Sequence, residues 1–385
     1  MLLPESAGRA GPPILVLTAG YGEGHNAAAR ARAAAIDDEA GPGTARIIDL
    51  FALATPRLNT VVRRAYFGAI NHTPRLWGRL FNWLDRHDTI PRRLSLMPAP
   101  LRKLEAILAA EQPVAVCSTY PAYGIMLDHL ARQGRFALAH FTVVTDSISI
   151  NSLWWRAPST GWFLPNEESA DVLRRAGVAP GRVHVHGFPV PRYFGDEAAR
   201  LAPPDLTAGA APRVLYIVHS GTRHAGQTAR LLLAETDWEI TFAVGRDEAL
   251  RRELAALARN RFRRAEVLGW TNRIPELLMT HHAVVSKAGG ATVQEAIAAL
   301  CPMIVNQIVP GQEEGNYELM RRRGAGALAQ TPDEVISALR RAFAWRGAVW
   351  RQWRRALEPL ARPSAARDIA LHVLDHARAP RADRV

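Results

Sequence analysis

The sequence predicts an α/β protein of two doubly wound domains, each a parallel sheet covered by helices. Short apolar or β-branched runs alternate with longer helical patterns along almost the whole chain, which is typical of parallel sheets. The order of strand, glycine-containing turn and helix that begins at Ile14 begins again at Val214. At 385 residues the chain also exceeds the length, roughly 250 to 300 residues, at which one hydrophobic core usually stops growing.

The predicted strands are short runs rich in Val, Ile, Leu and Ala. They are Ile14–Ala19, Arg46–Leu50, Val114–Ser118, Phe136–Thr145, Gly161–Leu164, Val183–His186, Val214–His219, Glu239–Val244, Glu266–Leu268, Ala283–Ser286 and Met303–Asn306. The predicted helices between them include Ala27–Glu39, Leu101–Ala110, Glu167–Ala176, Thr228–Ala234, Glu248–Ala258 and Thr292–Leu300. The stretch Pro332–Ala379 predicts further helices.

A stretch rich in Pro, Ala and Gly follows Phe194 and interrupts this alternation, so it predicts the domain linker. We expect an N-terminal domain over residues 1–195, a linker over 196–212 and a C-terminal domain over 213–345. Helices over 346–385 would follow, with the N-terminal domain as a candidate packing surface. Because ligands of such sheets bind beyond the carboxyl ends of the strands, two facing edges predict a ligand cleft.

The composition predicts a globular protein in a reducing compartment. Hydrophobic residues make up 48% of the chain and charged residues 22%, which argues against disorder. The two cysteines, Cys117 and Cys301, lie inside apolar runs and are expected to be buried thiols. The N-terminus lacks the pattern of a secretion signal, and no stretch reaches the length of apolar residues that a membrane span needs. A cytoplasmic location is therefore expected.

The first motif is TAGYGEGHNAAARARAAA, at the end of the first predicted strand. Its glycines allow a tight turn, and the helix that follows directs free N–H groups at the same place, as in phosphate and nucleotide sites. Asp49 at the end of the second strand could serve a dinucleotide site, but His25 stands where that fingerprint needs a small residue. At a helix N-terminus, His25 favours the neutral ring that a general base needs, although it could equally just hydrogen-bond the turn.

The second motif begins with SKAGGATVQEA and ends with PGQEEGN. A strand ends, turns through Gly289 and Gly290 and opens a helix, again a geometry suited to phosphate, to which Lys287 adds a charge. Glu295, about one turn into that helix, is placed to accept hydrogen bonds from sugar hydroxyls.

Together, GEGHNAAA, SKAGGATVQEA and PGQEEGN resemble the family of monogalactosyldiacylglycerol synthases and processive diacylglycerol glucosyltransferases, and more distantly MurG. The resemblance covers roughly residues 14–331. It implies a GT-B fold, a UDP-sugar donor on the C-terminal domain and a lipid acceptor on the N-terminal domain.

The resemblance also implies residue roles. His25 would be the catalytic base, with Asp146 as a second catalytic residue, and Glu295 would hold the donor ribose. Gln312, Glu313 and Asn316 would hold the transferred sugar, and Ile274 would lie beside the uracil. The remaining donor-binding candidates, mostly in the phosphate-binding turns, are Gly24, Ser220, Gly221, Lys287, Gly289, Gly290 and Thr292. The loop His219–Gly226 has fewer glycines than is usual in the family, and VTDSISINSLWW has Asn151 in an interval where the family often shows a histidine.

The expected activity is inverting transfer of a hexose from a UDP-sugar to a lipid hydroxyl, with diacylglycerol as the leading acceptor. No Asp-x-Asp triplet occurs, so no metal and no other cofactor are expected, and helix N-termini and Lys287 would meet the charge of the leaving group. The alternatives are a MurG-like UDP-N-acetylglucosamine transferase acting on another lipid-linked acceptor, a sugar-nucleotide 2-epimerase, and a sensor without turnover.

The net charge of +12 favours anionic partners, and much of it lies between Arg57 and Lys103. Nucleic acid is the weakest choice, since that segment lacks a recognition motif. Aromatic residues interleave with its arginines, which predicts peripheral docking on an anionic membrane surface, the inner face of the cell membrane, against the alternative of a merely solvated helix face. The membrane-binding candidates are Arg63, Arg64, Trp77, Trp83, Arg92 and Arg93.

Overall fold

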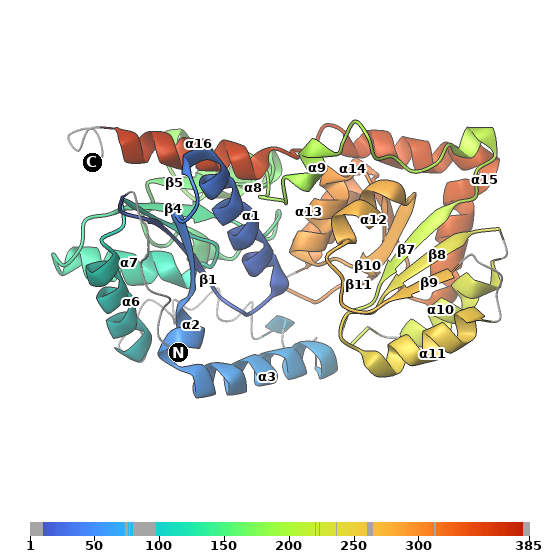
Figure 1. Ribbon diagram of the computed structural model, residues 1–385, viewed down its shortest axis with the longest axis horizontal. Helices are drawn as coiled ribbons and strands as arrows, with labels where there is room; N and C mark the ends of the chain where they lie inside the picture. Colours follow the sequence, from blue (N-terminus) through green and yellow to red (C-terminus); the bar gives the residue numbers. More distant parts are fainter. Residues whose placement is uncertain are drawn as a thin grey trace.

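The chain forms two parallel six-stranded sheets lying side by side (Figure 1), in a computed structural model. The described residues are 11–73, 76, 78–79, 98–219, 221–222, 224–235, 237–259, 265–311 and 313–379. The first sheet has the order β2-β1-β3-β4-β5-β6 and the second β12-β11-β10-β7-β8-β9, and every neighbouring pair is parallel. This confirms the predicted fold class.

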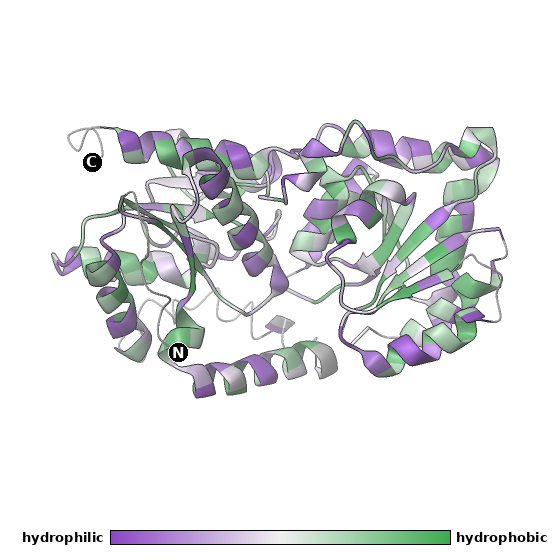
Figure 2. Ribbon diagram, viewed as in Figure 1, coloured by the Kyte–Doolittle hydropathy of each residue, from purple (hydrophilic) through white to green (hydrophobic). Residues whose placement is uncertain are grey.

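The described strands have two to five residues each. The first sheet contains β1 (Ile14–Thr18), β2 (Ala45–Asp49), β3 (Ala115–Ser118), β4 (Ala139–Val143), β5 (Gly161–Phe163) and β6 (Val183–His184). The second contains β7 (Arg213–Ile217), β8 (Glu239–Ala243), β9 (Ala265–Leu268), β10 (Ala283–Lys287), β11 (Met303–Gln307) and β12 (Gly326–Leu328). The central strands are apolar along their length, as Figure 2 shows for the second sheet, because helices cover both faces.

Helices connect the strands. In the first half they are α1 (Glu23–Ala40), α2 (Leu50–Ala54), α3 (Pro56–His72), α6 (Pro98–Glu111), α7 (Ala122–Arg132), α8 (Glu167–Arg175) and α9 (Tyr193–Asp196). In the second half they are α10 (Ala225–Ala234), α11 (Glu248–Arg259), α12 (Ile274–Thr280), α13 (Gly290–Ala298), α14 (Glu314–Arg323), α15 (Pro332–Leu357) and α16 (Ala365–Arg378). No helix in the described ranges is long and apolar enough to cross a bilayer.

The chain crosses from one sheet to the other twice, and the two crossing segments are in contact. Gly187 has φ +102°, and a Cβ placed on it would lie 2.5 Å from Cβ of Arg362, so only glycine fits this crossing. Beyond it, Phe188 is already buried among residues of the second sheet. The last helix, α16, returns to pack against α1 and buries Ile369 against the first sheet (Figure 1). The domain limits remain a prediction, and we propose that the N-terminal limit lies just before Phe188.

Candidate functional site

The glycine turn after β1 is held by Asp49. One carboxylate oxygen of Asp49 accepts a hydrogen bond from the Gly20 N–H at 3.1 Å, and the other accepts one from the Ala52 N–H at 3.0 Å, which caps α2. The guanidinium of Arg63 also lies against the turn, with its Cζ 3.0 Å from where a Cβ of Gly20 would be. Asp49 therefore has a structural role in the loop, and Arg63 faces the turn.

His25, in the first turn of α1, is held in one orientation. Its Nδ1 lies 2.6 Å from the carbonyl oxygen of Thr119 and 3.0 Å from Oγ1 of Thr145. A carbonyl oxygen can only accept, so Nδ1 carries the proton and the neutral ring keeps its lone pair on Nε2. Burial lowers the pKa of His25 to about 4, so the ring is neutral at pH 7. His25 is thus poised to accept a proton at Nε2, as a general base does.

Asp146 lies near His25 but contacts it through another residue. Its carboxylate accepts a hydrogen bond from Nε1 of Trp154 at 2.7 Å, and burial raises its pKa to about 6. The Trp154 ring centroid is 6.2 Å from that of His25. The carboxylate of Asp146 therefore holds the indole of Trp154 beside His25.

On the facing sheet, the turn after β10 is organised by an ion pair. Lys287 pairs with Glu313, whose other oxygen accepts the Val309 N–H at 2.9 Å. Next to them, Nε2 of His219 lies 3.0 Å from Oγ of Ser286, and burial together with Lys287 lowers the pKa of His219 to about 3. The two predicted donor contacts, Lys287 and Glu313, therefore bind each other, which leaves lone pairs on Glu313 for further hydrogen bonds.

Asn316 and Glu295 are two further polar residues among the predicted donor contacts. Asn316 donates from Nδ2 to the Ala288 carbonyl at 3.1 Å, while its buried Oδ1 has no hydrogen-bond partner among the described residues. Glu295 lies in the second turn of α13, where burial, reinforced by Glu23 of α1, raises its pKa to about 7. Since α13 packs against α1, Glu295 lies in a helix at the boundary with the N-terminal half.

The remaining predicted donor residues lie along the same edge. Gly289 is the N-cap of α13 and Gly290 its first residue, Thr292 is in its first turn, and Ile274 begins α12. Gly221 lines a pocket of about 580 Å³ between the loops that follow β7 and β8. Ser220 and Gln312 lie outside the described residues, as do the membrane candidates Trp77, Trp83, Arg92 and Arg93.

The loop after β4 joins the two halves of the site. The Thr145 carbonyl oxygen would lie 3.1 Å from a Cβ on Gly290, and a Cβ on Gly24 would lie 3.7 Å from the Ala291 amide nitrogen. Thr145 therefore contacts both His25 and the start of α13. Sequence reasoning missed Thr119 and Thr145, although each lies just beyond the carboxyl end of a buried strand.

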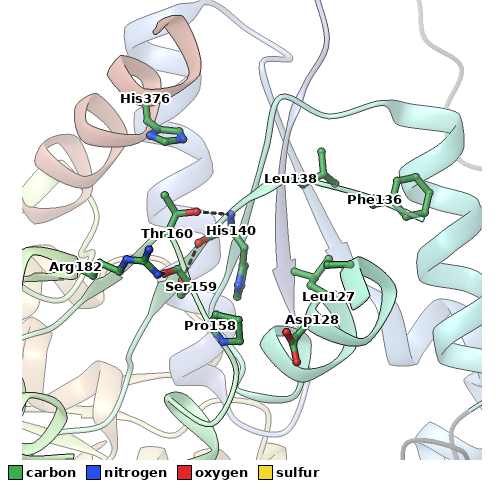
Figure 3. Close-up of a pocket in the computed structure, with 11 residues that line it drawn as sticks. Leu127, Asp128, Phe136, Leu138, His140, Pro158, Ser159, Thr160, Arg182 and His376 are labelled. Atoms are coloured by element: carbon green, nitrogen blue, oxygen red, sulfur yellow. Dashed lines mark hydrogen bonds between the residues drawn. The ribbon is translucent and has the colours of Figure 1, made fainter. Parts of the chain in front are cut away.

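A second pocket, of about 340 Å³, lies at the other end of the first sheet (Figure 3). Its lining includes His140 near the start of β4, with Thr160 hydrogen-bonded to the His140 N–H at 3.1 Å. Since the motifs follow the carboxyl ends of strands, this pocket is separate from the site described above.

The comparisons with known proteins agree with the motifs. Residues 25–190 match the family described as monogalactosyldiacylglycerol (MGDG) synthase. A processive diacylglycerol beta-glucosyltransferase from Bacillus cytotoxicus is 24% identical over 331 residues, which cover 84% of each chain. The protein of the same name from Bacillus subtilis is 23% identical over 85% of each chain. The resemblance stated from the sequence is confirmed.

Solved structures share the fold at low identity. A UDP-glucosyltransferase from Polygonum tinctorium matches with a TM-score of 0.61 and 13% identity, over 97% of this chain and 100% of that one. A UDP-GlcNAc 2-epimerase from Neisseria meningitidis, bound to UDP-GlcNAc, matches with a TM-score of 0.59 and 12% identity, over 94% and 100%. These likenesses confirm the GT-B fold. Because a transferase and an epimerase both match, the fold alone does not separate the two activities.

Proposed function

We propose that this chain is an inverting hexosyltransferase that moves a sugar from UDP to the hydroxyl of diacylglycerol. Its relatives named diacylglycerol glucosyltransferases support this acceptor, and the UDP-glycosyltransferase fold supports the donor. The observation that carries the proposal is the position of Thr145, which contacts both Nδ1 of His25 and the start of α13. The proposed base and the proposed phosphate-binding turn are therefore adjacent.

In the proposed reaction, Nε2 of His25 removes the proton from the acceptor hydroxyl as its oxygen attacks the anomeric carbon. The bond from that carbon to the UDP oxygen breaks on the opposite side, so the anomeric configuration inverts. UDP leaves as an anion beside the N-terminus of α13, where backbone N–H groups and the helix dipole stabilise negative charge. Glu295 would hold the ribose, while Glu313 and Asn316 would bind the sugar.

The proposal is tested by measuring UDP release from UDP-glucose and UDP-galactose in the presence of vesicles with and without diacylglycerol. Release that depends on diacylglycerol is expected. Release at the same rate without diacylglycerol would show hydrolysis or another acceptor. Conversion of UDP-N-acetylglucosamine to its 2-epimer, with no lipid present, would favour the epimerase, to which only the shared fold points.

The proposed role of Glu295 predicts how its substitution affects UDP binding. Glu295→Ala is expected to weaken UDP binding by about tenfold, since the hydrogen bonds that Glu295 would make to the ribose contribute about 0.5–1.5 kcal/mol each. Isothermal titration with UDP measures this directly. Glu276→Ala, at a partly exposed carboxylate paired with Arg273 on α12, is the matched control. UDP affinity equal to that of the wild type in Glu295→Ala would remove Glu295 from the ribose site.

The acceptor side of the proposal includes membrane docking through α3, which extends below the first sheet toward the second (Figure 1). Leu58 and Val61 lie one turn apart on this helix and are 60% and 62% exposed. Arg57 and Arg64 are exposed on the same helix. An exposed apolar stripe flanked by arginines is typical of a helix that lies in the interface of an anionic bilayer. We propose a peripheral location on the inner face of the cell membrane.

The triple variant Leu58→Ser, Val61→Ser, Arg64→Ser is expected to bind vesicles of acidic phospholipid at least tenfold more weakly than the wild type. The arginine contributes about 1 kcal/mol near an anionic surface, and each apolar side chain on the order of 1 kcal/mol. Co-sedimentation at two salt concentrations measures the effect. Trp345→Ser, at a side chain 89% exposed in the non-helical kink within α15, is the control for a general loss of apolar surface. Equal sedimentation of the triple variant and the wild type would contradict docking through α3.

A further inference from the structure

Three histidines from two distant segments meet on the face of the first sheet that α16 covers. His184 ends β6, His186 follows two residues later, and His372 lies in α16. One ring nitrogen of each lies within 4.8 Å of the other two, and Nε2 of His186 is 3.5 Å from Nδ1 of His372. The rings of His184 and His186 are nearly parallel. The ring of His372 packs edge-on against that of His184, with the two ring centroids 4.4 Å apart.

We propose that His184, His186 and His372 bind a divalent transition-metal ion, with Zn²⁺ as the best fit. Imidazole nitrogen is a preferred ligand of Zn²⁺. Zn–N bonds of about 2.0–2.1 Å in a tetrahedral site place the ligand nitrogens about 3.3 Å apart. The separation of 3.5 Å between His186 and His372 already approaches that value. Three histidines leave a fourth position for water.

The surroundings suit neutral imidazole ligands. All three rings pack on Phe163, which is fully buried. Burial lowers the pKa of each of the three histidines, that of His372 to about 4, so their lone pairs are available at pH 7. All three side chains are partly exposed, which gives an ion access from solvent.

Nearby charges affect how tightly the three histidines would bind a cation. Asp368 lies one turn before His372 on α16 and acts on His186, which favours a cation. Arg32, whose guanidinium lies 5.4 Å from the Phe163 ring centroid, acts on His372 and opposes a cation. The opposing charges of Asp368 and Arg32 therefore partly cancel at the site.

Because the three histidines lie on two separate segments, an ion bound by them would have a structural role. β6 is the edge strand of its sheet, four strands from β1, and α16 is the last helix in the described part of the chain. An ion held by both segments would fix α16 onto the sheet. Because metal binding to the folded state alone stabilises it, added Zn²⁺ should raise the melting temperature.

The test is titration of ZnCl₂ into the full-length, tag-free protein after chelator treatment and desalting, followed by calorimetry. The wild type is expected to bind one equivalent. His184→Ala and His372→Ala are each expected to bind at least tenfold more weakly, since even loss of a group that only orients a ligand costs about 10- to 100-fold. His129→Ala, in α7, is the control and should bind as the wild type does.

Co²⁺ provides a second readout, because a tetrahedral site with three nitrogen ligands absorbs visible light far more strongly than hydrated Co²⁺ does. Circular dichroism without metal shows whether each variant is folded, and His186→Gln replaces any alanine variant that is not. Absence of Zn²⁺ binding and of the Co²⁺ spectrum in the wild type would overturn the proposal. Unchanged affinity in folded His184→Ala and His372→Ala would overturn it as well.

Discussion

His25→Ala is expected to lower kcat by about 10²- to 10⁴-fold, the usual contribution of a general base. Nδ1 of His25 donates to the Thr119 carbonyl, so Nε2 is the atom that accepts the proton, and alanine removes it. The pKa of about 4 means that the ring is neutral at pH 7. Steady-state kinetics with UDP-sugar and diacylglycerol measure the loss.

The affinity of the His25→Ala variant for UDP should be unchanged, because the residues proposed to hold the nucleotide lie on α13 and the loops of the second sheet. Calorimetry with UDP therefore separates loss of the base from loss of the fold. His129→Ala, in α7 and hydrogen-bonded to Gln133, is the matched control and should retain full activity. A kcat within twofold of the wild type in His25→Ala would rule this residue out as the base.

Gly315→Ala is expected to lower kcat/KM by on the order of 10²-fold, as displacements of about 1 Å at a reacting centre do. A Cβ at this position would lie 1.8 Å from the Ser147 carbonyl oxygen and 2.5 Å from the Ser149 amide nitrogen. The loop that carries Thr145 and Asp146 must therefore move away from α14. That movement separates the His25 side of the site from the donor side.

Gly181→Ala is the matched control, since a Cβ there meets no atom within 4 Å. Both variants should keep the circular dichroism of the wild type, which shows that the two sheets are folded. Activity of Gly315→Ala equal to that of Gly181→Ala would mean that catalysis does not need the contact between Gly315 and Ser147.

The sequence was sufficient for the fold because buried parallel strands are continuous apolar runs. The run beginning at Ile14 is fully buried in β1, and the repeat at Val214 corresponds to β7. β12 was missed, because Gly326–Leu328 has three residues, only partial burial and no alternating pattern. The predicted strand Phe136–Thr145 was too long, since only Ala139–Val143 pairs with its neighbours.

The position of the site was predictable, and its internal contacts were not. Both motifs follow strand ends, so the carboxyl-edge rule places them correctly. The pairing of Lys287 with Glu313 joins residues 26 positions apart, and spacing alone does not indicate it. In the same way, helical spacing on α3 does not reveal that Arg63 turns toward Gly20 whereas Arg64 is exposed.

The most direct test of the account is mass analysis of the lipid formed from UDP-glucose, UDP-galactose or UDP-N-acetylglucosamine and total lipid, with the anomeric configuration read by NMR. We expect diacylglycerol carrying at least one hexose, joined by a β-linkage from the α-linked donor, and formed by the wild type but not by His25→Ala. A sugar-nucleotide epimer formed without lipid, or a glycolipid that retains the α configuration, would contradict the account.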